Sequence, residues 1–200
     1  MHNIDQSAFE WLNPPDHFEL SDGSVRMTTE PHTDLWQRTY YGFRNDNAHA
    51  LLLVAPPAAF TFSFTAAWQP QGQYDQCGLL VYQDADNWFK ASVEYEDENF
   101  SRLGSVVTNL GYSDWATTDI SSDLRHVTYR LSRRADDFRI EYAMPGQQFV
   151  QMRIFHMHHI QEKARVGIYA CSPLQSSFEA VFTDLLLADC LWQPYSPANT

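Results

Sequence analysis

Hydrophobic and polar residues alternate along much of this chain, with the period of two that half-buried strands show. In segment 58–68 three phenylalanines alternate with Thr and Ser. Segment 88–96 alternates in the same way, so that Phe89, Ala91 and Val93 face one side of the strand and polar residues face the other. Almost every apolar segment follows this pattern, which predicts an all-β protein with under about 10% helix.

The stretch 74–115 is the clearest example, and it predicts an antiparallel meander. Three strands cover 76–83, 88–96 and 100–109, and the turns between them are rich in Asp and Asn, which hydrogen-bond to their own backbone. One face of the meander is apolar, whereas the other is polar yet carries Trp and Tyr. That combination is typical of a sugar-binding or catalytic sheet. The alternative is an ordinary solvent-facing sheet with a cross-strand Lys–Glu pair.

The remaining chain extends the same pattern to about twelve predicted strands separated by regular turn signals, as in a sandwich or a barrel. Segment 116–122 is predicted to be a connection, and only 6–12 and 158–163 are compatible with a helical turn. No linker or internal repeat divides the 200 residues. We therefore expect one domain spanning residues 1–200, with a loose tail from about residue 192.

Charge and cysteine usage narrow the partners and the compartment. The formal net charge of −12 would repel phosphate, so we expect neither nucleic acid nor a membrane as a partner. The first residues lack the basic and apolar regions of a signal peptide, and no apolar run is long enough to span a bilayer. Cys77 and Cys171 lie in apolar strand patterns, which predicts buried free thiols. These observations together predict a cytoplasmic protein.

Several sequence blocks resemble a known family. The blocks are TDLWQRTYYGFRNDNAH, YDQCGLLVYQDADNWFKASVEY and SVVTNLGYSDW, followed by CSPLQSSFEAVF. Their order and spacing are similar to those of the regulation-of-enolase family over roughly residues 9–187. Ala48 stands where that family usually has Gly, which removes a permissive turn residue but no chemical group.

The resemblance implies a fold more clearly than a function. It implies a concanavalin A-like jelly-roll sandwich of two antiparallel sheets, an architecture that also hosts lectins and glucanases. It further implies a link to enolase regulation, because one fungal member has that link. Fold-level analogy does not by itself assign an activity.

We expect a ligand groove where segment 31–49 meets the polar face of the meander. That segment carries aromatic and polar residues with little apolar periodicity, as functional loops do. Aromatic rings cover the apolar faces of a sugar, while polar side chains bond its hydroxyl groups. The candidate ligand-binding residues are Trp36, Arg38, Tyr41, Asn47, His49, Gln76, Tyr82, Trp88, Lys90, Glu94 and Trp115.

Lys90 and Glu94 are predicted to form the floor of this groove, since both point to the non-core face of their strand. Arg38 is the expected third partner of this ion pair. The simpler alternative is that Trp36 and Trp115 only seal the ends of the sandwich.

Carboxylates at alternate positions raise the possibility of catalysis. Same-face residues i and i+2 of a strand lie ~6.6 Å apart, and a retaining glycosidase needs carboxyl groups about 5–5.5 Å apart. The spacing therefore permits a pair of Glu94 and Glu96, with Glu94 the catalytic residue if the protein is an enzyme. The interpretation we favour treats Glu96 and Glu98 as solvated acids of a turn.

Two further clusters have metal-like composition. His156, His158 and His159 form an H-x-H-H string without an evident further ligand. Asp84, together with the following Asp and Asn, resembles a calcium-type oxygen cluster but also suits a turn. We predict no metal and no cofactor.

The function favoured by these patterns is non-catalytic binding of a carbohydrate or small polar, sugar-like metabolite on the concave face of the sandwich. One alternative is a regulatory protein that binds a metabolic enzyme, as the resemblance implies. The other is a glycoside hydrolase or lyase.

Overall fold

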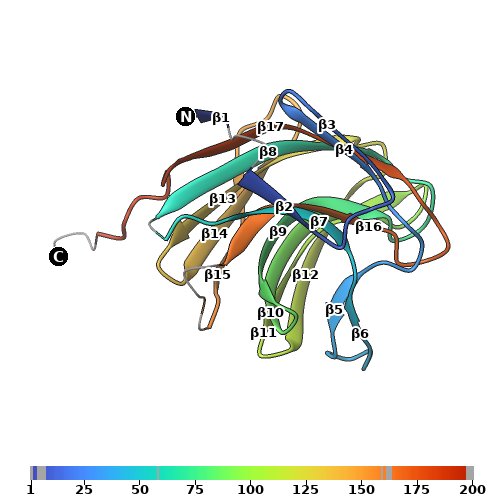
Figure 1. Ribbon diagram of the computed structural model, residues 1–200, viewed down its shortest axis with the longest axis horizontal. Coiled ribbons are helices and arrows are strands. Elements are labelled where there is room, and N and C mark those ends of the chain that lie inside the picture. The colour runs from blue at the N-terminus through green and yellow to red at the C-terminus, as the bar shows by residue number, and fades with distance from the viewer. Residues whose placement is uncertain (1, 4–7, 58, 159, 161–163, 197–200) are drawn as a thin grey trace.

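The alternating segments form strands of two antiparallel sheets that pack face to face, one above the other in Figure 1. The structure is a computed structural model that describes residues 2–3, 8–57, 59–158, 160 and 164–196. The described residues contain no α-helix, which confirms the prediction of an all-β fold. Over the same residues, no helix is long and apolar enough to cross a membrane.

The larger sheet has the order β15-β14-β13-β8-β17-β4-β3, with β1 paired to β17. Its centre is β8, the strand with the alternating phenylalanines, which pairs with β13 on one side and β17 on the other. The strands are β1 (His2–Asn3), β3 (His17–Ser21), β4 (Ser24–Thr28), β8 (Phe60–Gln69), β13 (His126–Arg134), β14 (Asp137–Ala143), β15 (Val150–His156) and β17 (Glu179–Asp189).

The smaller sheet has the order β12-β11-β10-β9-β16-β7-β2. Three adjacent strands of it, β9, β10 and β11, are the meander predicted from the sequence, and β12 extends it. Figure 1 shows β10, β11 and β12 curving downward, away from the larger sheet. The strands are β2 (Phe9–Leu12), β7 (His49–Val54), β9 (Gln76–Asp84), β10 (Asn87–Tyr95), β11 (Phe100–Asn109), β12 (Tyr112–Ser121) and β16 (Arg165–Cys171).

One expectation about local structure is wrong. Segment 116–122 is not a connection, because β12 continues to Ser121, which pairs with Phe100. Most of its side chains are exposed on an edge strand, so no apolar alternation marks it in the sequence. Within 6–12, which is compatible with a helical turn by sequence, Phe9–Leu12 forms the strand β2, which pairs with β7. Most of the other candidate turn, 158–163, lies outside the described residues.

The main core fills the space between the two sheets. Phe62 and Phe64 from β8 meet Phe89 and its same-face neighbours from β10 in one buried cluster. Phe89 also stacks on Phe155 of β15, with ring centroids 3.9 Å apart. The predicted inward face of β10 is thereby confirmed. Cys77 lies in this core as predicted, and burial raises the pKa of its thiol.

The described part of the tail, up to Ser196, begins with an anchored residue. The carbonyl oxygen of Trp192 accepts a hydrogen bond of 2.5 Å from Nε of Arg134. The guanidinium of Arg139 lies 5.7 Å from the centre of the Trp192 ring. The tail therefore starts from a fixed point on the larger sheet.

A third, two-stranded element consists of β5 (Leu35–Gln37) and β6 (Arg44–Asp46). Figure 1 shows this β5–β6 hairpin below the smaller sheet, on the side away from the larger sheet. Its turn bends sharply, since Arg38, Tyr40 and Gly42 have φ values of 56°, 63° and 78°. Such a left-handed backbone conformation is disfavoured for residues other than Gly and Asn.

Candidate functional site

A second apolar cluster lies on the outer face of the smaller sheet. Strand alternation places the side chains at even positions of β10 on this face, opposite the core residues at odd positions. The β5–β6 hairpin covers part of this face, which explains why a nominally polar face is rich in aromatic residues. The buried members of the cluster are Leu35, Trp36, Ala48, Ala50, Leu52, Leu80, Tyr82, Trp88, Val106, Tyr169 and Cys171.

Polar contacts fix the hairpin against the sheet at two places. Near the β9–β10 turn, Arg44 Nη2 forms an ion pair of 2.8 Å with Asp86 Oδ1, and the Tyr82 hydroxyl donates to Asp46 Oδ2 at 3.0 Å. Against β12, the backbone N–H of Gln37 donates to Ser113 Oγ at 3.0 Å. The hairpin is thus held as a fixed wall beside the sheet.

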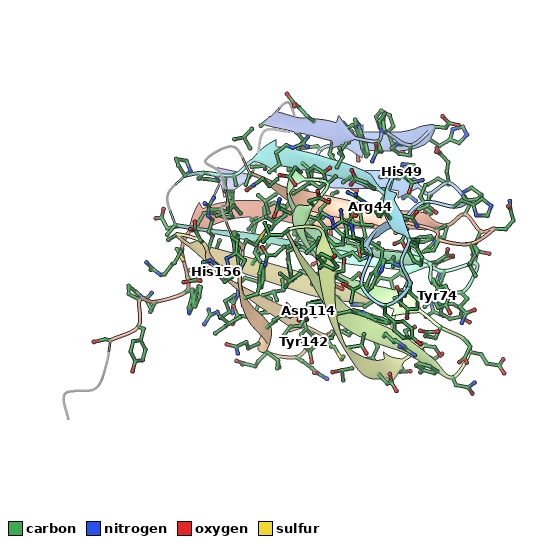
Figure 2. The ribbon with its side chains drawn as sticks, turned by 90° about the horizontal axis from the view of Figure 1, so that it is seen from below. Arg44, His49, Tyr74, Asp114, Tyr142 and His156 are labelled. Atoms are coloured by element: carbon green, nitrogen blue, oxygen red, sulfur yellow. The ribbon has the colours of Figure 1, made fainter. Side chains whose placement is uncertain are left out.

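A pocket of about 490 Å³ lies between this wall and the curved strands β10, β11 and β12. Figure 2 views the molecule from below, with Tyr74, one of the lining residues, at one side and His156 at the other. The pocket combines aromatic rings with five charged side chains. It is lined by Asp34, Trp36, Tyr41, Phe43, Asn45, Tyr74, Lys90, Glu94, Glu96, Arg102, Val106, Trp115, Pro173 and Leu174.

Lys90 provides a buried cation at the floor of the pocket. Its Nζ lies 3.3 Å from Asp34 Oδ1 and donates a 3.0 Å hydrogen bond to Gln76 Oε1. Burial, the largest single effect, disfavours the ammonium, but Asp34 together with Cys171 and Glu94 outweighs it, so the pKa of Lys90 is raised. Lys90 therefore remains charged at neutral pH. Asp34, and not the predicted Arg38, is the third member of the floor.

Glu94 is the second charged group of the floor. Its Oε2 accepts a 2.7 Å hydrogen bond from Gln76 Nε2. Burial raises the pKa of Glu94 to about 7, although Lys90 and Arg102 partly offset the effect. At physiological pH this carboxyl group is therefore poised between its neutral and its ionised form.

Glu96 and Arg102 form a charged pair on one side of the pocket. The Arg102 Nε lies 2.7 Å from Glu96 Oε1, and Gln73 Nε2 donates to Glu96 Oε2 at 3.2 Å. Glu96 lies beyond the last residue of β10 and is only 9% exposed. The interpretation of Glu96 as a solvated turn acid is therefore wrong, whereas Glu98 is exposed in the turn as expected.

Two tryptophans form the aromatic side of the pocket. The rings of Trp36 and Trp115 meet edge to face, with centroids 6.2 Å apart. Trp36 is nearly buried, at 8% exposure, whereas Trp115 is 38% exposed. Gly104 leaves room for the Trp115 indole, because a Cβ there would lie 3.2 Å from Trp115 Nε1. Tyr41 extends the aromatic surface, 5.5 Å from Trp36.

The structure brings five of the predicted ligand-binding residues together as pocket lining: Trp36, Tyr41, Lys90, Glu94 and Trp115. Gln76 supports two of them from the adjacent strand. Trp88 is fully buried, and its ring centre lies 6.0 Å from Lys90 Nζ. Tyr82 is bonded to Asp46 of the hairpin, as described above. These three residues support the pocket without lining it.

The other three predicted residues lie elsewhere. Arg38 lies 5.3 Å from the centre of the Tyr112 ring, at the β11–β12 turn. The Asn47 side chain bonds the backbone of Asp34 and His32, and so shapes the loop before the hairpin.

His49 is buried, with its ring bonded to the Asn13 carbonyl and the Glu30 backbone N–H. It occupies an odd position of β7, on the same face as the core residue Leu51. That face is turned away from the pocket.

Several lining residues were missed by sequence reasoning, and some of them had a detectable signal. Arg102 pairs directly with Glu94 in the β10–β11 register, and a register follows from the predicted turn at 97–99. Tyr74, which lies outside the predicted strands, has a left-handed backbone with φ of 69°. Pro173 and Leu174 come from a loop far away in sequence, and no local pattern brings them to this pocket.

The metal-like clusters have other roles. Asp84 Oδ1 accepts hydrogen bonds from the Asp86 backbone and the Asn87 side chain, which is turn chemistry. His156 Nδ1 lies 2.8 Å from Asp137 Oδ1, while His159 lies outside the described residues. Within the described part of the chain, no group of three or more His, Cys, Asp or Glu side chains is arranged to hold a metal ion.

Comparison with known proteins places this sandwich in a family. Residues 11–190 match the family model described as "Protein of unknown function (DUF1349)". This chain belongs to the DUF1349 family. It is 30% identical over 182 residues to "Regulation of enolase protein 1" of Saccharomyces cerevisiae, covering 91% of this chain and 90% of the yeast protein. The resemblance noted from the sequence blocks is thereby confirmed.

Solved structures confirm the fold of this DUF1349 chain. A functionally unknown protein from Saccharomyces cerevisiae superposes with a TM-score of 0.86 at 28% identity, covering 94% of this chain and 100% of the other. A GH43 protein from Bacillus licheniformis has a TM-score of 0.69 at 14% identity, covering 90% of this chain but 36% of that one. An alginate lyase from Klebsiella pneumoniae has a TM-score of 0.59 at 9% identity, covering 88% and 85%. At such low identity, the last two show the sandwich fold alone.

Proposed function

We propose that this protein binds a carbohydrate or a similar polyhydroxylated metabolite in the pocket between the β5–β6 hairpin and strands β10–β12, without transforming it. The observation that supports this proposal most strongly is that the pocket has one aromatic side and one polar side. Trp36 and Trp115 form an aromatic side, and Lys90, Glu94 and Arg102 supply hydrogen-bonding groups in the same cavity.

This division suits the two kinds of surface on a sugar ring. The C–H faces of a pyranose stack on aromatic rings, whereas its equatorial hydroxyl groups need donors and acceptors. A volume of about 490 Å³ falls in the range of about 300–1,000 Å³ that is common for small-molecule sites. The aromatic side is preformed, because Trp36 Nε1 donates to the Thr39 carbonyl at 3.2 Å and fixes the ring. Such preformation lowers the entropic cost of binding.

A titration series tests this function. Binding of mono- and oligosaccharides is measured by isothermal titration calorimetry for the wild type and for Trp115→Ala. We expect at least one sugar to bind, and the loss of the Trp115 ring to weaken it about tenfold. The matched control is Tyr112→Ala, which removes an exposed aromatic of the same strand that does not line the pocket. Binding that is insensitive to Trp115→Ala, or no binding at all, would contradict the proposal.

A second candidate function is docking to a metabolic enzyme, and an exposed aromatic tip favours it. Tyr40 is 94% exposed at the end of the β5–β6 hairpin, and its ring lies 5.0 Å from that of Tyr41. Tyr112 is 61% exposed, and the centre of its ring lies 5.3 Å from Cζ of Arg38, which belongs to the same hairpin turn as Tyr40. Exposed aromatic clusters are common at protein interfaces. The name of the yeast relative suggests enolase as the enzyme to test.

Titration of purified enolase tests this second function. We expect Tyr40→Ala to weaken the complex at least tenfold, because exposed interface tyrosines often contribute most of the binding energy. The control is Val54→Ala, a change at another exposed apolar side chain, on β7. If enolase does not bind, or binds both variants equally, the tip is not its docking site.

A further inference from the structure

The charged groups that line the pocket do not all pair with one another. Lys90 is paired with Asp34, and Arg102 with Glu96. Glu94 remains, and among the described residues it forms no ion pair. In its ionised form it gives the lining a net charge of −1, because three carboxylates then face two cations.

The hydrogen bond that Glu94 does make leaves its charge uncompensated. The donor, Gln76 Nε2, belongs to a neutral amide whose oxygen is already bonded to Lys90 and to the Tyr169 hydroxyl. The amide is therefore fixed in one orientation. Lys90 and Arg102 attract the charge of Glu94 from farther away, but burial has the larger effect. An ionised carboxylate that is half-buried in this way gains stability when a cation enters the pocket.

The aromatic side of the pocket also favours a cation. The faces of aromatic rings carry negative potential and attract ammonium groups within about 6 Å. Arg102 already occupies one such position, 5.5 Å from the centre of the Trp115 ring. Within the described residues, Trp36 and Tyr41 have no such partner. The formal net charge of −12 adds a long-range attraction for positive ligands.

We propose that the ligand of this pocket is an amino sugar, whose protonated amine pairs with Glu94 while its ring stacks on the exposed aromatic side chains. This inference rests on the proposed carbohydrate-binding function and names the class of sugar. Glu94 is then the residue that determines specificity. A neutral sugar would leave the ionised Glu94 unpaired, and an anionic sugar would be repelled by it.

Matched ligands test the proposal. Glucosamine, galactosamine and mannosamine, with their short oligomers, are titrated by calorimetry at pH 7.5 and low salt beside the parent hexoses and the N-acetylated forms. Each set differs only in the substituent at C2. We expect one amino sugar to bind at least tenfold more tightly than its hydroxyl and N-acetyl counterparts. One charge-assisted hydrogen bond to a half-buried carboxylate contributes about that much affinity.

Two variants and a pH change distinguish recognition of the amine's charge from a general loss of sugar binding. Glu94→Gln keeps the shape of the side chain and should abolish the preference for the amine. Glu98→Gln, an exposed change in the adjacent turn, should retain it. Lowering the pH from 7.5 to 5.5 protonates Glu94 and completes the protonation of the amine, so loss of the Glu94 charge alone should make the wild type bind the amine about tenfold more weakly. The other titratable or charged groups that interact with Glu94 are Lys90, Asp34, Glu96, Arg102, Tyr74, Tyr169 and Cys171.

The outcomes distinguish this inference from the function on which it rests. If neutral sugars bind through Trp115 as tightly as the amines, or if Glu94→Gln keeps the preference, the amino-sugar inference is wrong and the carbohydrate function stands. If no sugar of any class binds, both are wrong.

Discussion

The side-chain amide of Gln76 joins two groups of opposite charge, because it donates a 2.7 Å hydrogen bond to Glu94 and accepts a 3.0 Å hydrogen bond from Lys90. One neutral side chain on β9 thus fixes the position of both charged groups on β10. The Glu94 carboxyl is held in place without a formal ion pair.

The raised pKa of Glu94 predicts a specific pH dependence of stability. Its pKa rises from 4.5 in the unfolded chain to about 7 in the folded protein, so the folded protein binds more protons between these values. Ionisation of Glu94 therefore destabilises the fold progressively as the pH rises from about 4.5 to about 7. A shift of this size corresponds to roughly 3 kcal/mol.

Chemical denaturation of the wild type and Glu94→Gln at pH 5 and pH 8 measures this effect. We expect the variant to gain roughly 2 kcal/mol relative to the wild type between these two pH values, because Gln cannot ionise. Glu98→Gln serves as the control and should show no such gain. Parallel pH profiles for the wild type and Glu94→Gln would show that Glu94 titrates normally.

The ion pair between Asp34 and Lys90 predicts a strong energetic coupling. Both side chains are largely buried, at 13% and 6% exposure, so removing either one leaves the other poorly compensated. We expect Asp34→Asn and Lys90→Met each to cost about 3 kcal/mol, and the double variant to cost clearly less than the sum. A double-mutant cycle by urea denaturation measures the coupling, and additive losses would mean that the pair does not act as a unit.

The thiols report on both apolar clusters. Cys77 lies between the sheets and Cys171 in the cluster under the hairpin, whereas Cys190 is partly exposed. Burial raises the pKa of both the Cys77 and the Cys171 thiol, which lowers their reactivity further. We expect a thiol reagent to label Cys190 first in the native protein and the other two only after unfolding. Rapid native labelling of Cys171 would show that the hairpin opens readily.

Glycoside hydrolysis is the activity that the carboxylates would support if the pocket were catalytic, and we expect it to be absent. A retaining mechanism needs one carboxylate free to attack the sugar. Both oxygens of Glu96 are engaged, one by Arg102 and one by Gln73. Incubation with a panel of β-glucans and xylans should release no reducing sugar. Hydrolysis that disappears in Glu94→Gln would instead identify a glycosidase.

Alternation in the sequence was sufficient to predict the two faces of the central strand. Phe89 turned out to face the core and Lys90 the pocket, because a strand allows no other arrangement of successive side chains. His49 was placed in the groove because it ends the poorly periodic segment 31–49, but it begins β7 and lies on the same face as the core residue Leu51. A buried histidine bonded to backbone groups has no distinctive sequence signature.

The role of the hairpin was the main feature that the sequence could not reveal. Segment 31–49 was expected to bring several of its residues to a ligand, but Asn47 shapes the loop and Arg38 lies at the β11–β12 turn. Asp34 took the place expected for Arg38 beside Lys90. These choices depend on where the hairpin docks, which is decided by contacts distant in sequence such as Arg44 with Asp86.

The indole resonances of the protein provide the most direct test of the pocket as a binding site. The chain contains six tryptophans, at positions 11, 36, 68, 88, 115 and 192, and two of them line the pocket. Their indole N–H signals are assigned by single Trp→Phe variants in two-dimensional ¹H–¹⁵N spectra, and sugars that include the amine series are then titrated. The account predicts saturable shifts at Trp36 and Trp115, with the signals of Trp68 and Trp192 unchanged. Shifts confined to Trp192, or no shift with any sugar, would contradict it.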